Sequence, residues 1–108
     1  MTTLPTQRGE GVTVRVLISY GTDVGGYAWT ENQAQEFAYM VRYGMSPMAA
    51  IKSATSVAAK LLGQEDNFGT IETGKLADIV AVKADPIADI SELTRVIFVM
   101  KAGVVYKQ

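Results

Sequence analysis

The 108-residue chain contains no cysteine and no histidine. Borderline-soft metals take thiolate and imidazole ligands, so the sequence argues against a zinc site built within this chain alone. The same absences exclude disulfides, cysteine nucleophiles and histidine-based proton relays. Any catalysis by this chain alone would have to use carboxylates, lysine, serine, threonine or tyrosine.

The sequence also lacks an excess of charge of either sign, and it lacks long apolar runs. Ten basic and eleven acidic side chains give a formal net charge of -1, which provides no basic field for nucleic acid or an anionic membrane. No run approaches the ~18 apolar residues that span a bilayer, and the polar start has no signal-peptide core. With 48% apolar content, we expect one modest soluble domain in the cytoplasm, with neither nucleic acid nor membrane as a partner.

The first part of the chain predicts a strand followed by a helix. Residues 12–19 are rich in β-branched residues and predict a strand that is apolar on both faces and needs cover on both sides. Apolar spacing then predicts a helix over residues 30–43, starting at Thr30 or Asn32 and ending at Gly44.

A second helix is predicted directly after the first. Ser46 offers an N-cap and Pro47 the first helical position of a helix over residues 47–62, which Gly63 closes. Because only a short connection separates the two helices, they must turn sharply against each other. Methionines at 40, 45, 48 and 100 are expected to fill the core.

The hydrophobic period changes near Asn67, the one candidate boundary within the chain. We therefore divide the chain into residues 1–66, a strand–helix–helix segment, and residues 67–108, a β segment. In the second segment the pattern predicts a strand over residues 79–82 and a turn with a short helical piece over residues 87–93. Two further strands, over residues 96–101 and 104–107, are predicted to form a tight hairpin.

Residues 69–75 match the GxxxxGK pattern of a phosphate-binding loop. However, Leu76 stands where such a loop needs a serine or threonine for magnesium, and the motif precedes a strand instead of opening a helix. We interpret the motif as a turn that feeds the following strand. Asp78 is expected to bond backbone amides there, and Asp85 to cap the turn at Pro86.

Asp23 is the candidate site residue. It follows the first predicted strand, in a loop with three glycines. In α/β enzymes the catalytic residues lie at such C-terminal ends of strands. A carboxylate there suits a metal-bound water or a general base, but aspartates in such loops are also turn or cap residues. Tyr20, Tyr27 and Trp29 could line a pocket, a partner surface or a satellite core. A carboxylate-only mechanism that joins Asp23 to Lys75 or Tyr27 has no support from spacing.

Three strings of residues occur in order along the chain: Gly21-Thr22-Asp23-Val24-Gly25, Gly44-Met45-Ser46-Pro47-Met48 and Gly74-Lys75-Leu76-Ala77-Asp78-Ile79-Val80. Together they resemble the C-terminal end of the amidohydrolase superfamily, in its imidazolonepropionase-like and Xaa-Pro dipeptidase-like branch. The resemblance covers nearly the whole chain after about residue 14. It implies an α/β fold in which residues 12–19 form the last strand of a (β/α)8 barrel. The two helices would be the final barrel helix and an added one, and the later strands part of the accompanying composite β-sandwich.

The resemblance also implies a metal-dependent hydrolase of C–N bonds in amides, peptides or cyclic amides. Asp23 would be the family's last-strand aspartate, which ligates zinc or another divalent metal and takes the proton from the hydrolytic water. The family's other ligands, histidines and a bridging lysine, lie upstream in its pattern and have no counterpart here. Tyr27-Ala28-Trp29-Thr30 also stands where the branch often carries a histidine. We therefore expect no cofactor in this chain alone.

Two functions of different class remain open. The chain is either the C-terminal fragment of a metal-dependent amidohydrolase, inactive without the missing barrel portion, or a non-catalytic, self-associating module that reuses the fragment's fold. Open sheet edges and a two-sided apolar strand would otherwise aggregate. The expected partner is therefore a second copy of the chain or a complementary barrel fragment.

Overall fold

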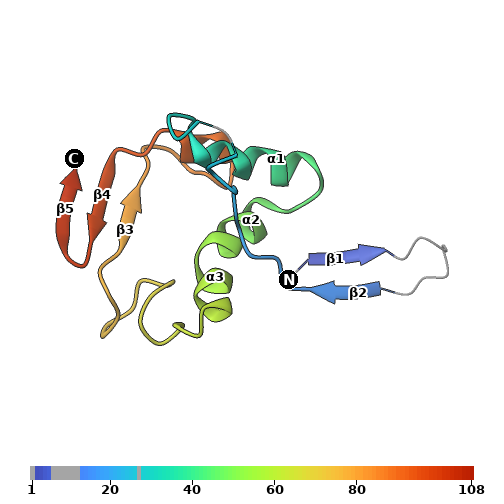
Figure 1. The fold of residues 1–108 in the computed structure, drawn as a ribbon, viewed down its shortest axis with the longest axis horizontal. Coiled ribbons are helices and arrows are strands. Elements are labelled where there is room, and N and C mark those ends of the chain that lie inside the picture. The colour runs from blue at the N-terminus through green and yellow to red at the C-terminus, as the bar shows by residue number, and fades with distance from the viewer. Residues whose placement is uncertain (1, 6–12, 27) are drawn as a thin grey trace.

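The computed structural model describes residues 2–5, 13–26 and 28–108 of this small α/β chain. The helices lie between two separate sheets, with β1 and β2 on one side and β3, β4 and β5 on the other (Figure 1). The elements are, in order, β1 (Thr2–Pro5), β2 (Thr13–Val16), η1 (Gln33–Gln35), α1 (Glu36–Arg42), α2 (Pro47–Ala54), α3 (Ser56–Leu61), β3 (Ile79–Ala81), η2 (Ile90–Thr94), β4 (Phe98–Lys101) and β5 (Val104–Lys107).

The first strand is shorter than the sequence predicted. The strand expected over residues 12–19 is β2, which covers Thr13–Val16 and pairs antiparallel with β1. Residue 12 lies outside the described residues. Leu17 is 50% exposed and, with the two residues after it, continues the chain outside any strand. A strand forms only where a neighbour completes its ladder of hydrogen bonds, and within the described chain these apolar residues have no such neighbour.

The predicted helix caps are confirmed. Asn32 caps η1, its side-chain oxygen accepting a hydrogen bond from the backbone amide two residues on at 3.1 Å. Ser46 caps α2 in the same way, with 3.1 Å to the amide three residues on. Gly44 takes a φ of 118°, which ends the first helix. One correction concerns the start of that helix: the helix expected over residues 30–43 begins as the 3-10 turn η1 and becomes α1 at Glu36.

The second predicted helix is broken, contrary to the single helix expected over residues 47–62. Thr55, with φ −122° and ψ −96°, separates α2 from α3. Its hydroxyl donates to the carbonyl of Ile51 at 2.9 Å, a back-bond that bends helices. The loop at Gly69 packs against this break, because a Cβ built at Gly69 would lie 3.0 Å from the Thr55 carbonyl oxygen.

The C-terminal segment contains the predicted strand and hairpin, which join in an antiparallel sheet in the order β3-β4-β5. Ala102 and Gly103 both take positive φ values, 49° and 80°, which confirms a tight two-residue hairpin between β4 and β5. Asp78 accepts a hydrogen bond from the Ala102 amide at 2.8 Å. Asp85 accepts one from the Ile87 amide at 2.9 Å, so both aspartates have the predicted structural roles. The short helical piece expected within residues 87–93 is η2, which covers Ile90–Thr94.

The core is small. Among the residues whose side chains are described, Ala50, Ser53, Ala59 and Glu92 are the buried ones. Met48 is 48% exposed, so the expectation that it fills the core is wrong. The accessible surface is 7857 Å², against about 5,800 Å² for a compact monomer of this mass. No helix in the described ranges is long and apolar enough to cross a membrane.

Candidate functional site

The segment that carries Asp23 is held at three points. The backbone amide of Tyr20 donates to the carbonyl of Ser53 at 2.9 Å, which attaches the segment to α2. The Tyr20 hydroxyl donates to the backbone carbonyl of Gln33, and the Thr22 hydroxyl donates to the Gln33 side-chain oxygen at 3.1 Å. The residues that precede Asp23 are thereby fixed to α2 and to η1.

Asp23 itself lies at a turn, with a φ of 53°. Its carbonyl accepts a hydrogen bond from the Gly26 amide at 3.5 Å, and aspartate is one of the residues that tolerate the left-handed region. Its side chain is exposed and makes no hydrogen bond or ion pair within the described part of the chain. The residue therefore has the turn geometry of a structural aspartate and the accessible carboxylate of a functional one.

Tyr20 and Trp29, the described aromatic residues among the three expected around this loop, have different surroundings. The ring of Tyr20 packs on Phe37 of α1, with ring centroids 4.5 Å apart. Trp29 is 72% exposed and points away from any core. Tyr27 lies outside the described residues. Tyr20 therefore belongs to the packing between the Asp23 segment and α1.

A polar pocket of about 290 Å³ lies beside the Asp23 segment. Its wall consists of side chains from this segment, η1 and the start of α1: Thr22, Glu31, Gln33, Gln35 and Glu36. Sequence reasoning missed Gln33, because its partners lie 11 and 13 residues earlier and no local spacing signals such contacts.

The described residues do not form a complete metal site. They contain no group of three or more histidine, cysteine, aspartate or glutamate side chains placed to hold an ion. A zinc site takes three or four ligands, and Asp23 supplies one carboxylate. The donor set of the described residues therefore does not fit the metal that the resemblance implies.

The lysine of the GxxxxGK motif is engaged inside its own turn. Lys75 Nζ lies 2.7 Å from Thr70 Oγ1 and 2.8 Å from Glu72 Oε2, and its side chain is 17% exposed. The hydrogen bond from Lys75 and a second one from Thr70 hold the pKa of Glu72 below its ordinary value. The motif leads into β3, as expected, and its lysine is not available to a phosphate.

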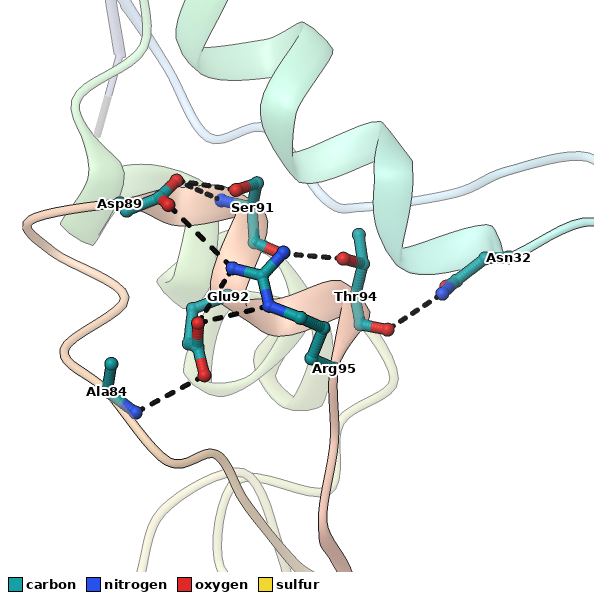
Figure 2. Close-up of polar contacts among 7 residues, drawn as sticks. All are labelled: Asn32, Ala84, Asp89, Ser91, Glu92, Thr94 and Arg95. Carbon is teal, nitrogen blue, oxygen red and sulfur yellow. Dashed lines mark hydrogen bonds and ion pairs between the residues drawn. The ribbon is translucent and has the colours of Figure 1, made fainter.

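Asn32 connects the Asp23 region to the C-terminal segment. Its side-chain amide donates to the carbonyl of Thr94 in η2 at 2.9 Å (Figure 2). The next residue, Arg95, pairs with the buried carboxylate of Glu92 at 2.7 Å. Glu92 Oε1 also accepts from the Ala84 amide at 3.3 Å. The Arg95 hydrogen bond is the main cause that keeps the pKa of Glu92 below its ordinary value, and burial works against it.

An apolar groove of about 570 Å³ separates the helices from the sheet. It runs along the side of β3 that has no strand partner among the described residues. Apolar side chains from α2, α3, the following loop and β3 line much of it, among them Ile51, Ala54, Ala58, Leu62, Phe68 and Ile79. The groove leaves these apolar side chains partly open to solvent.

Known proteins match this chain along most of its length. The model of the amidohydrolase family matches residues 10–106. The chain belongs to the amidohydrolase family. Ochratoxinase from Aspergillus niger is 36% identical over 96 residues, which cover 85% of this chain and 20% of that protein. Imidazolonepropionase from Aromatoleum aromaticum is 42% identical over 50 residues, or 46% of this chain and 12% of that one.

Solved structures of amidohydrolase-like enzymes share the fold. A Xaa-Pro dipeptidase with bound methionine in its active site superposes with a TM-score of 0.79 at 50% identity, covering 84% of this chain and 22% of that one. Molinate hydrolase gives 0.62 at 40% identity, over 64% of this chain and 15% of that one. The predicted family is confirmed, and the chain spans about a fifth or less of the length of these relatives.

Proposed function

We propose that this chain is the C-terminal part of a metal-dependent amidohydrolase that hydrolyses amide or peptide C–N bonds. The observation that supports this most is the likeness to the Xaa-Pro dipeptidase, at 50% identity and a TM-score of 0.79. In this proposal β2 and the residues after it correspond to the last barrel strand, and β3 to β5 to part of the composite sheet. The chain is placed in the cytoplasm, as its composition suggests.

The proposed role of Asp23 is to contribute one carboxylate to an active site that other residues complete. Its side chain is exposed at the end of the segment after β2, and two contacts to Gln33 hold that segment. The described donor set is incomplete for a metal. We therefore propose that the chain is inactive by itself and requires a complementary barrel portion.

Complementation tests this function. The chain is co-expressed with a Xaa-Pro dipeptidase-like barrel that ends before its own last strand, and hydrolysis of Xaa-Pro dipeptides is measured on the purified complex. We expect dipeptide hydrolysis by the complex and none by either part. Asp23→Asn should lower kcat about 100-fold or more, because it removes a carboxylate that takes a proton.

Asp66→Asn is the matched control, since Asp66 is an exposed aspartate in a loop after α3. It should leave hydrolysis unchanged. A complex that forms but does not hydrolyse dipeptides or other small amides contradicts the proposal. Full activity in Asp23→Asn would remove Asp23 from the site while leaving the hydrolase assignment in place.

The alternative, a self-associating module, is favoured by the amount of accessible surface. The chain exposes about 2,000 Å² more than a compact monomer of its mass, as much as a stable protein interface buries in total. Leu62 is 66% exposed and lines the apolar groove. Two copies that cover this groove would hide Leu62 and the apolar side chains beside it.

Light scattering on the purified chain tests the alternative. We expect a dimer or larger species, which Leu62→Glu shifts toward the monomer because a carboxylate cannot be buried cheaply in an apolar interface. Leu61→Glu is the control, because Leu61 is 73% exposed but does not line the groove. A wild-type chain that stays monomeric at high concentration contradicts self-association.

A further inference from the structure

Gln33 contacts the Asp23 segment with both its backbone and its side chain. Its carbonyl accepts the hydrogen bond from the Tyr20 hydroxyl, and its side-chain oxygen accepts the one from Thr22 at 3.1 Å. Thr22 directly precedes Asp23. One residue of η1 thus fixes the backbone immediately before the proposed site carboxylate.

The position of Gln33 is set from two directions. Asn32 caps η1 through its side-chain oxygen, which accepts from the Ala34 amide at 3.1 Å. The nitrogen of the same Asn32 side-chain amide donates to the Thr94 carbonyl at 2.9 Å, and this bond connects η1 to η2. The Asn32–Thr94 hydrogen bond therefore fixes Gln33 relative to the C-terminal segment. The Thr22–Gln33 hydrogen bond in turn fixes Thr22 relative to Gln33.

We propose that Gln33 is a positioning residue for Asp23, and that it acts through Thr22. The inference rests on the proposed function of Asp23. An exposed carboxylate at a left-handed turn has few contacts of its own, so its direction depends on the backbone before it. The Thr22–Gln33 hydrogen bond restricts that backbone, and loss of orientation at a reacting group lowers the rate without removing the group.

The first test measures order in the free 108-residue chain, without any activity assay. Backbone order parameters from ¹⁵N relaxation should be about 0.85 at Thr22 and Asp23 in the wild type. Thr22→Val and Gln33→Met each remove one side of the hydrogen bond at nearly constant shape, and should lower the value at Asp23 toward about 0.6.

Matched variants separate this role from general damage to the fold. Thr22→Ser keeps the hydroxyl and should restore wild-type order. Gln35→Ala removes a neighbouring glutamine that lines the same pocket and makes no side-chain cap bond, and should have no effect. Because the two side chains act as one contact, the double variant Thr22→Val with Gln33→Met should be no more mobile than either single variant. Mobile Asp23 in the wild type, or unchanged order in the single variants, overturns the proposal.

The second test uses the complex with the barrel portion. Gln33→Met and Thr22→Val should lower kcat about 10-fold to 100-fold with KM nearly unchanged, and Thr22→Ser should recover the rate. A rise in KM with unchanged kcat would overturn the positioning role. The two proposals fail separately. Loss of order in the free chain together with full activity of Asp23→Asn would contradict the role of Asp23, whereas inactive Asp23→Asn with fully active Gln33→Met would contradict the role of Gln33.

Discussion

At the scale of single residues, Gly69 has the least room for a side chain among the described glycines. A Cβ there would lie 2.6 Å from the Cβ of Ala59, and the φ of 104° is one that side chains rarely adopt. We expect Gly69→Ala to lower the free energy of unfolding by about 2 kcal/mol or more, in urea denaturation followed by circular dichroism. Gly21→Ala is the control, because a Cβ at Gly21 meets nothing within 4 Å. Equal effects of the two changes would contradict the steric account.

A second residue-scale prediction concerns pH. The Arg95 hydrogen bond keeps the pKa of Glu92 below its ordinary value in the folded chain. The ionised carboxylate therefore adds stability above about pH 4.3, the unfolded value, and this contribution is lost as the pH falls through the lower folded pKa. We expect Glu92→Gln to lower the urea midpoint at pH 7 and to differ much less from the wild type at pH 3. Glu65→Gln, a change in an exposed loop, should show no such pH-dependent difference.

At the scale of secondary structure, the hairpin between β4 and β5 contains a correctable strain. Ala102 takes a φ of 49°, a conformation that costs an alanine about 1 kcal/mol and that asparagine tolerates better. Ala102→Asn creates the Asn-Gly pair that such turns favour, and should raise the free energy of unfolding by about 0.5–1 kcal/mol in thermal or urea unfolding. Ala88→Asn, at an exposed position outside the left-handed region, should bring no gain. Destabilisation by Ala102→Asn would contradict the claim that the positive φ at residue 102 strains the alanine.

The elements that the sequence predicted well are those with local signals. The caps at Asn32 and Ser46 and the turn at Gly103 follow from one or two residues each, and all three are present. The helix break at Thr55 was not predicted. The back-bond from Thr55 to Ile51 is local, but the packing of the Gly69 loop against the break is a long-range contact that a local pattern does not record.

The same distinction applies to the candidate site. The family could be predicted from the order of the motifs, whereas the strand expected to lead to Asp23 ends at Val16 and the role of Asp23 stays a prediction. The contacts of Gln33 could not be predicted, since a glutamine in the first turn of a helix is ordinary by itself. β1 was missed as well, because Thr2–Pro5 is short and polar and contains a proline.

At the scale of the whole molecule, the chain is more open than a compact domain. Its radius of gyration is 15.6 Å, against about 13 Å for a compact chain of this length. The large apolar side chains around the helices contribute little to internal packing, since Leu62 and Ile71 are 66% and 81% exposed. These observations agree with a chain whose apolar surfaces are completed by a partner.

This openness gives a prediction on stability. Leu62→Gln and Ile71→Thr should each change the free energy of unfolding of the dissociated chain by about 0.5 kcal/mol or less, while reducing the binding of a hydrophobic dye. Ala50→Leu, at a fully buried position, is the contrasting variant and should destabilise by about 1–3 kcal/mol. Large destabilisation by Leu62→Gln in denaturant titrations would show that this side chain belongs to the chain's own core.

The hydrogen bond from Asn32 to Thr94 also affects the order in which parts of the chain fold. It joins residues 62 positions apart, so it can form only after most of the chain has been synthesised and has come together. The turn around Asp23 is made early but reaches its final geometry late. Pulse-labelled hydrogen exchange should therefore find that the amides of α2 become protected first, and that the amides of η2, which the Asn32 bond attaches to η1, become protected later. A newly made chain would carry the Asp23 carboxylate before the contacts between η1 and η2 have formed.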